Sequence, residues 1–226
     1  MKNLILRPQN RIFILLAIIG LLLLLVFLQS HKTINPQTEP PLQTTKKLLS
    51  LKCSKPRSTS PITHVMLHFC SYAIENPTNP YRFEDIFKTF ETYGVSAHYL
   101  IDREGQIYQL VEENRVAYHA GKGHLPHEAH RQNDLNGRSI GIEMMAIGTK
   151  KEMKMFMSEA QYEQIPKDCI GFTEAQYKSL NLLLADIRKR HSTISYDRKH
   201  IVGHDEYAPT RRSDPGSLFD WKKIGL

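Results

Sequence analysis

The C-terminal stretch Gly203-His204-Asp205-Glu206-Tyr207-Ala208-Pro209-Thr210-Arg211-Arg212-Ser213-Asp214-Pro215-Gly216 combines a nitrogen ligand with a carboxylate. Its proline and glycine residues predict a single loop that carries both His204 and Asp214. Zinc is bound by imidazole nitrogen and carboxylate oxygen, and a catalytic zinc site has three protein ligands and a water. The stretch therefore offers two candidate ligands, and a third has to come from elsewhere. A His and an Asp on a loop are also common as plain surface residues.

The charge distribution argues against a nucleic-acid partner. The 226 residues carry a formal net charge of +7. Residues 1–60 hold nine basic side chains against one acidic side chain, so residues 61–226 have a net charge of −1. The basic excess lies in the N-terminal tail, and the remaining chain has no overall field that would attract DNA or RNA.

A run of seventeen uncharged, mostly aliphatic residues extends from Ile12 to Leu28. A helix of that length spans about 25 Å, which is just enough for the hydrocarbon core of a membrane. Lys2, Arg7 and Arg11 precede the run, which favours an N-terminus in the cytoplasm. We predict a cytoplasmic segment over residues 1–11 and a single-pass signal-anchor over residues 12–29, with the rest of the chain outside the cell membrane. If the segment is cleaved, the protein is secreted.

Residues 30–61 are rich in Pro, Thr and Lys and predict an extended linker, followed by one folded domain over residues 62–226. Cys53, Cys70 and Cys169 show no CxxC spacing, so neither a disulfide framework nor a thiolate zinc site is indicated. One disulfide is possible in an oxidising compartment, and the odd count leaves at least one free thiol.

Within the domain, apolar segments typical of strands alternate with amphipathic segments typical of helices. Ser158 and Thr173 each open a capping-box sequence, and the second leads into a long helix. Residues 147–171 resemble an insertion over a cleft or a sheet edge. Strands are predicted over residues 62–69, 95–101, 106–111, 139–145 and 199–204, and helices over residues 82–93 and from residue 173.

Glu143 lies inside an apolar strand, on the face opposite to Ile140, Ile142 and Met144. A carboxylate on a buried strand needs a partner or has a raised pKa, which suits a general base. The alternative is an exposed position at a sheet edge.

Several histidines need separate interpretations. His68 ends the first strand of the domain, where a side chain often points into a cleft. His98 is expected to be a packed structural residue. Three closely spaced histidines after Gly123, namely His124, His127 and His130, have no standard metal-binding spacing and are expected to be exposed.

The segment from about Ile62 to Trp221 resembles the zinc-dependent N-acetylmuramoyl-L-alanine amidases, which share the fold of peptidoglycan-recognition proteins and phage-lysozyme-type amidases. No single motif is specific, but six occur in the right order. They are Val65–His68, Ser96–Ile101, Ala117–Gly121, Ser139–Glu143, Phe172–Gln176, and Gly203–Asp205 with Ser213–Gly216.

The resemblance implies an α/β fold, with a mixed central β-sheet flanked by α-helices. It implies hydrolysis of the amide bond between N-acetylmuramic acid and L-alanine in peptidoglycan or muropeptides, with no nucleic acid and no obligate protein partner indicated. It also implies roles for individual residues. One zinc ion per domain would be bound by His68, His204 and Asp214, with Glu143 as catalytic acid/base, Arg212 at the oxyanion and His119 lining the substrate cleft.

Three positions depart from the family pattern. Arg212 replaces a usual lysine, and its planar guanidinium has a different geometry. Cys70 follows His68 on the same strand face, so it either approaches the metal or is a core or free thiol. Ala97 stands where some branches have a catalytic tyrosine, which leaves Glu143 as the main candidate base.

Two other functions stay open at this point. One is a non-catalytic, membrane-tethered peptidoglycan-binding module. The other is a zinc peptidase or another amidohydrolase that uses the same site.

Overall fold

The computed structural model describes residues 42–58 and 60–226. Their centre is a six-stranded sheet in the order β1-β5-β4-β7-β3-β8. All neighbouring strands are parallel except β4 and β5, so the predicted mixed sheet is confirmed. The strands are β1 (Thr44–Lys46), β3 (His64–Cys70), β4 (Tyr99–Ile101), β5 (Ile107–Gln109), β7 (Ser139–Met145) and β8 (Ile201–Gly203). A second, antiparallel pair joins β2 (Ser54–Pro56) to β6 (Arg115–Ala117).

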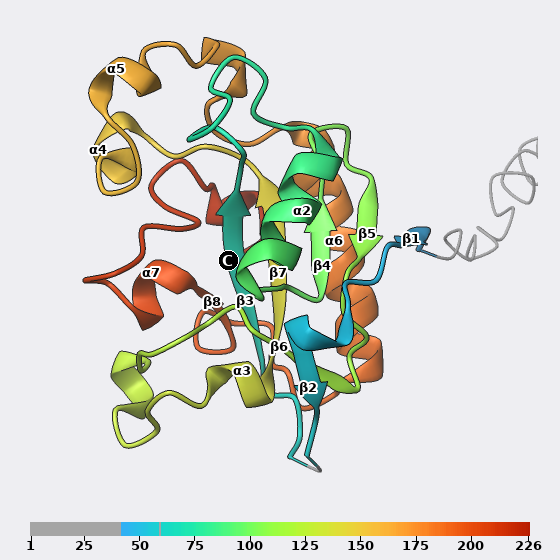
Figure 1. The fold of residues 1–226 in the computed structure, drawn as a ribbon. Coiled ribbons are helices and arrows are strands. Elements are labelled where there is room, and N and C mark those ends of the chain that lie inside the picture. Colours follow the sequence, from blue (N-terminus) through green and yellow to red (C-terminus); the bar gives the residue numbers. More distant parts are fainter. Residues whose placement is uncertain (1–41, 59) are drawn as a thin grey trace, which may run out of the picture. The chain divides into compact units, whose positions relative to one another are not determined.

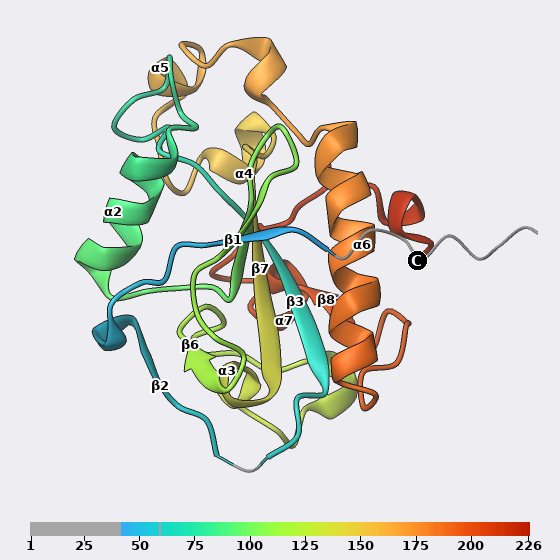
Figure 2. The ribbon, with the colours of Figure 1, turned by 90° about the vertical axis from the view of Figure 1, so that its right-hand side faces the viewer.

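Two helices cover opposite faces of the sheet (Figures 1 and 2). α2 (Phe83–Tyr93) ends at Gly94, whose φ of 63° is favoured by glycine. α6 (Glu174–Arg190) begins with the predicted capping box, in which Thr173 accepts a hydrogen bond from the Gln176 backbone. Leucines of α6 pack on one face of the sheet, and Ile86 and Phe90 of α2 pack on the other.

The alternation of side chains along two neighbouring strands decides which face carries polar residues. Val65 and Leu67 of β3, with Ile142 of β7, join the apolar core under α6. His68 therefore points to the opposite face. Its partner in the register is Glu143, so the two polar side chains lie next to each other on the α2 side of the sheet.

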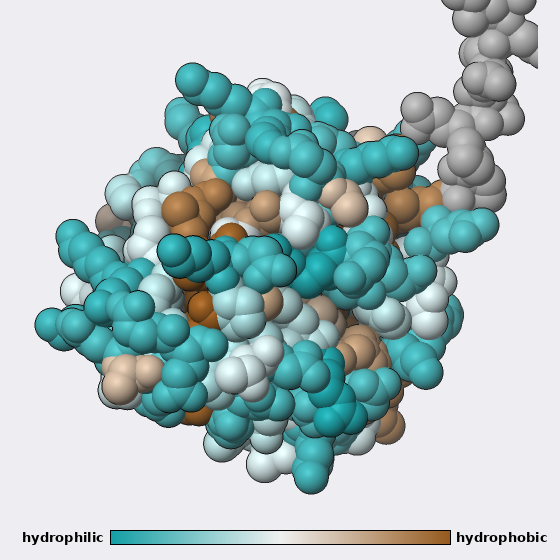
Figure 3. All heavy atoms as spheres, turned by 90° about the horizontal axis from the view of Figure 1, so that it is seen from above, coloured by the Kyte–Doolittle hydropathy of each residue, from teal (hydrophilic) through white to brown (hydrophobic). Residues whose placement is uncertain are grey.

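The short helices lie in the connections between these elements. The predicted insertion contains α4 (Lys150–Met153) and α5 (Glu159–Tyr162), which opens with the predicted Ser158 capping box. Met153, Met157 and Ile165 bury their side chains against Ala73 and Ile147. Seen from the end that carries α4 and α5, the surface is mainly hydrophilic, with hydrophobic patches in its recesses (Figure 3). The other connections hold α3 (Leu135–Arg138), α7 (His204–Tyr207) and 3-10 turns at Leu51–Cys53, Pro126–Glu128, Lys167–Cys169 and Trp221–Ile224.

The structure differs from the predicted linker over residues 30–61, because the compact unit begins at Leu42. β1 extends the sheet beside β5, and β2 pairs with β6. Leu49 and Cys53 are buried under α2, which offsets the cost of ordering this segment. Arg57 donates to the carbonyl oxygens of Glu113, Gly137 and Arg115, so this basic side chain holds the segment to the rest of the fold. Most other polar residues of the segment are exposed.

The predicted signal-anchor over residues 12–29 lies outside the described residues. Within residues 42–58 and 60–226, no helix has the length and apolar character needed to cross a membrane.

A half-buried carboxylate, that of Glu113, ties the end of α6 to the sheet. Glu113 accepts hydrogen bonds from Tyr99 Oη and Arg190 Nη2, each at 2.7 Å, and lies 2.7 Å from His191 Nε2. Burial alone raises the pKa of Glu113, but hydrogen bonds from Arg190, His191 and Tyr99 outweigh it and lower the pKa to about 2.

We expect the Glu113→Gln substitution to lower the free energy of unfolding at pH 7 by about 1–3 kcal/mol, because it removes a charged acceptor of three bonds. A lowered folded-state pKa gives stability that is complete above about pH 4.5 and is lost as the pH falls towards 2. The difference from wild type in urea denaturation should therefore shrink over that range. Glu112→Gln is the matched control, since its exposed pair with Lys46 contributes at most about 1 kcal/mol. Equal losses in both variants would contradict the assignment.

Candidate metal centre

Three adjacent parallel strands, β8, β3 and β7, bring polar residues to the same edge of the sheet. His68 lies near the carboxyl end of β3 and Glu143 near the carboxyl end of β7. His204 follows β8 directly and opens α7. Sites in open α/β sheets form at the carboxyl ends of parallel strands, so the position is set by the topology.

The three residues predicted as zinc ligands converge on one point. His68 Nδ1 lies 2.7 Å and His204 Nδ1 lies 3.0 Å from the same oxygen, Asp214 Oδ2. All three side chains are buried, with 1%, 2% and 7% of their surface exposed. Their ligand atoms lie within 4.8 Å of one another, so the group could hold a metal ion.

The outer nitrogens of the two rings are also engaged. His204 Nε2 donates to the carbonyl oxygen of Ala120 at 2.8 Å. His68 Nε2 lies 3.0 Å from His119 Nδ1. Both rings are therefore held at two points, and their Nδ1 atoms face the centre of the cluster.

Burial and hydrogen bonding shift the ionisation of the cluster towards the forms that bind metals. Burial lowers the pKa of His68 to about 4, so its imidazole is neutral at pH 7. Burial alone raises the pKa of Asp214, but its close contacts with His204 and His68 outweigh burial and hold the pKa well below its usual range. A neutral imidazole and an ionised carboxylate are the ligand forms that a divalent cation requires.

Glu143 faces the same space without a hydrogen-bonding partner for one oxygen. Its Oε2 is buried and unpaired among the described residues. Burial, followed by the charge of Asp214, raises the pKa of Glu143 to about 8. The predicted buried carboxylate with a raised pKa is thus observed, and the alternative of an exposed sheet edge is excluded.

Cys70 lies beside Glu143, and burial, followed by the charge of Glu143, raises the pKa of its thiol well above the usual value. Cys53, Cys70 and Cys169 are all free thiols. Cys70 is not among the residues whose ligand atoms converge, namely His68, His204 and Asp214, which agrees with the free-thiol alternative.

A cleft of about 210 Å³ opens onto this cluster. Arg212 and His119 both line it, at the positions from which an oxyanion contact and a cleft wall were predicted. Arg212 Nη1 donates to the carbonyl oxygen of Arg211 at 3.0 Å. The apolar part of the wall is formed by Phe69, Phe90, Val95, Tyr118 and Phe156.

Other histidines lie away from the cleft. His98 is fully buried, and its Nδ1 accepts a hydrogen bond from the Gly141 backbone, so its structural role is confirmed. His124, His127 and His130 are exposed, as predicted.

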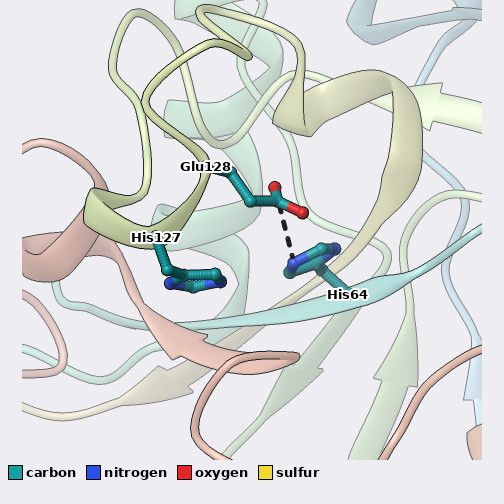
Figure 4. Close-up of side chains that lie close together, drawn as sticks. All are labelled: His64, His127 and Glu128. Carbon is teal, nitrogen blue, oxygen red and sulfur yellow. Dashed lines mark ion pairs between the residues drawn. The ribbon is translucent and has the colours of Figure 1, made fainter.

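A second group, His64, His127 and Glu128, could geometrically hold a cation (Figure 4). His64 Nε2 lies 3.9 Å from Glu128 Oε2. However, Arg138 pairs with Glu128, and its Nη1 lies 3.0 Å from His64 Nδ1. Because a fixed guanidinium already contacts two of the three side chains, a divalent cation would meet repulsion there.

Sequence reasoning did not identify three residues that support the cluster. Asn136 Oδ1 accepts hydrogen bonds from the backbone N–H groups of His119 and Ala120. Arg211 Nη2 donates to the carbonyl oxygens of Ala120 and Lys122. Ser139 Oγ lies 3.1 Å from His119 Nε2. These contacts join segments that are far apart in the chain, so no local sequence pattern predicts them.

Comparison with known proteins agrees with this geometry. Residues 58–217 match the family model described as N-acetylmuramoyl-L-alanine amidase. A relative is the 1,6-anhydro-N-acetylmuramyl-L-alanine amidase AmpD of Haemophilus influenzae, 38% identical over 129 residues, which cover 57% of this chain and 56% of that protein. The chain thus matches little more than half the length of this relative.

Solved structures of amidases have a similar fold. A selenomethionine derivative of AmpD superimposes with a TM-score of 0.59 at 24% identity, covering 80% of this chain and 92% of that one. The amidase AmiD of E. coli gives a TM-score of 0.53 at 27% identity, covering 75% and 59%. Since the family model spans most of the chain, the protein belongs to the N-acetylmuramoyl-L-alanine amidase family.

Proposed function

We propose that this protein is a zinc-dependent hydrolase of the amide bond between N-acetylmuramic acid and L-alanine. The observation that carries the proposal is the convergence of His68, His204 and Asp214 beside the Glu143 carboxyl, whose Oε2 is unpaired among the described residues. Two imidazoles and one carboxylate form a donor set typical of catalytic zinc, with an open position for water or substrate.

The hydrogen bonding of His204 supports a cation at this point. A carbonyl oxygen can only accept, so the bond to Ala120 places a proton on His204 Nε2. In a neutral ring, Nδ1 then presents a lone pair to Asp214 Oδ2 at 3.0 Å. Two electron-rich atoms at this distance repel each other unless a positive charge lies with them, and a zinc ion would supply it.

When bound, zinc lowers the pKa of a water towards neutrality and polarises the carbonyl under attack. A cation bound beside Asp214 would favour the ionised form of Glu143. In that form Glu143 would take the proton of the attacking water and pass it to the departing L-alanine amine. Arg212 would donate to the oxygen of the tetrahedral intermediate from the rim of the cleft. The aromatic wall would exclude water and hold the substrate in place.

The relatives suggest the range of substrates. AmpD is named for 1,6-anhydro-N-acetylmuramyl-L-alanine, and the structure of AmiD is a complex with anhydro-N-acetylmuramic acid-L-Ala-D-gamma-Glu-L-Lys. We propose that the same lactyl–alanine linkage is cut here. Assays should include both anhydro-muropeptides and muropeptides from intact wall, since the proposal requires cleavage in at least one of them.

We expect the full chain to bind one equivalent of zinc and to lose all measurable amidase activity in a strong chelator, with recovery on adding zinc. Asp214→Ala should abolish stoichiometric binding because it removes the carboxylate shared by both histidines. Metal analysis after dialysis checks the stoichiometry. Asp205→Ala is a matched control, since Asp205 directly follows His204 but its carboxylate is outside the metal group. Full activity after verified removal of zinc would refute the proposal.

We expect Glu143→Gln to lower kcat by about 10²–10⁴-fold, the usual contribution of general acid–base catalysis, with little change in zinc content. The substitution keeps the size of the side chain and removes its basic oxygen. Steady-state kinetics on a muropeptide, together with metal analysis, measure both quantities. A Glu143→Gln enzyme as fast as wild type would eliminate Glu143 as the base.

We expect Arg212→Ala to lower kcat by about 10²–10³-fold, because it removes a donor to the developing oxyanion. Arg212→Lys should retain more activity, since it keeps the charge and loses only the planar geometry. The comparison is made on kcat rather than KM. If both variants change only KM, Arg212 binds the ground state of the substrate and not the oxyanion.

We also propose that residues 12–29 anchor the enzyme in the cell membrane with the amidase domain on the outer side. The support is the uncharged run from Ile12 to Leu28 and the basic residues before it. Membrane fractionation and protease accessibility in intact cells or spheroplasts would test the anchor and its orientation. Recovery of the full-length chain in the soluble cytoplasmic fraction would contradict it.

A further inference from the structure

The dipeptide His119-Ala120 contacts both predicted zinc histidines on the side away from Asp214. His68 Nε2 lies 3.0 Å from His119 Nδ1, and His204 Nε2 donates to the Ala120 carbonyl oxygen at 2.8 Å. Two consecutive residues therefore hold both rings. Asn136 fixes this dipeptide by accepting hydrogen bonds from its two backbone N–H groups, at 3.0 and 2.7 Å.

A chain of hydrogen bonds runs from the Leu135 carbonyl group through Ser139 and His119 to His68. The carbonyl group fixes the direction of each bond in this chain. Ser139 Oγ lies 2.5 Å from the Leu135 carbonyl oxygen, which can only accept, so Ser139 uses its proton there. Ser139 Oγ then has to accept from His119 Nε2 at 3.1 Å. In a neutral ring, His119 Nδ1 is left as an acceptor for the proton on His68 Nε2.

The same deduction fixes the inner nitrogen of His68. With its only proton on Nε2, a neutral His68 presents a lone pair from Nδ1 towards Asp214. His204 reaches the same state through Ala120. Both rings are thus set in the tautomer that offers Nδ1 to a metal, before any metal is bound.

The close packing around His119 restricts its ring. A side chain at Gly141 would place its Cβ 2.6 Å from His119 Cγ, which is much closer than atoms can approach. The ring therefore packs closely against the backbone of β7, and only glycine at position 141 leaves room for it. This packing fixes His119 independently of its hydrogen bonds.

We propose that His119 and Ala120 orient the zinc ligands, and that His119 is a positioning residue for His68 rather than a contact for substrate. The inference rests on the proposed zinc site. A partner that fixes the tautomer of a ligating histidine typically changes metal affinity by 10–100-fold when it is removed.

The test measures zinc affinity of the full chain by competition with a chromogenic chelator. His119→Leu should bind zinc 10–100-fold more weakly, because leucine offers no acceptor to His68. His119→Gln should recover most of the affinity, since an amide can accept from His68 and donate to Ser139. Gly141→Ala should weaken zinc binding by displacing the ring while every hydrogen-bonding group is retained.

Tyr118→Leu is the control, because Tyr118 lines the same cleft and makes no hydrogen bond to a zinc histidine in the described residues. It should raise KM and leave zinc affinity unchanged. Wild-type zinc affinity in His119→Leu, combined with a raised KM, would overturn the proposal and assign His119 to the substrate. Absence of zinc from the wild-type protein would instead defeat the proposed function itself.

A measurement on the zinc-loaded wild type avoids any loss of folding in the variants. Long-range ¹H–¹⁵N NMR of the imidazole rings distinguishes the two tautomers. His68, His119 and His204 should all carry their proton on Nε2. A proton on Nδ1 of His119 would break the deduced chain and contradict the proposal.

Discussion

The contact of one carboxylate oxygen with two histidines determines the organisation of the site. Asp214 Oδ2 lies 2.7 Å from His68 Nδ1 and 3.0 Å from His204 Nδ1. These residues come from opposite ends of the domain, and the parallel pairing of β3 with β8 brings them together. Because the same β3 pairs with β7 on its other side, Glu143 is placed beside His68 by backbone hydrogen bonding. The chemistry therefore depends on the register in which β3 pairs with β7. A shift of either strand by one residue would turn His68 or Glu143 to the other face of the sheet.

The segment before the domain contributes to this arrangement. β2 pairs with β6, and only Tyr118 separates the end of β6 from the dipeptide His119-Ala120 that contacts both histidines. Ser96 Oγ donates to the Cys53 carbonyl oxygen and accepts from the Tyr118 backbone, which joins this segment to the cleft wall. Residues 42–57 thus brace the loop behind the site. A segment with the composition of a linker is part of the scaffold that positions the site.

Much of the fold and the candidate site could be predicted from the sequence, because its signals are local or belong to a family pattern. The capping box at Thr173 and the glycine at position 94 mark helix ends through short-range chemistry. His204 and Asp214 were candidate ligands from the loop sequence, and Glu143 was a candidate base from its apolar strand. The resemblance added His68 as the third ligand, and the structure brings the four residues together. The roles of Asn136, Ser139 and Arg211 could not be predicted, since each depends on a contact across a long sequence separation. The linker prediction failed over residues 42–57 because composition does not reveal which few apolar residues, here Leu49 and Cys53, find a buried surface.

The central claim is that this site cuts the lactyl–alanine amide bond of muropeptides. Mass spectrometry of a defined muropeptide digested by the full chain tests it directly. The account predicts two products, a free peptide with an L-alanine amino terminus and a muramic acid with an intact lactyl carboxylate, which differ from the substrate together by one water. A product cut within the peptide, with the lactyl–alanine bond intact, would contradict the account and indicate a peptidase at the same site.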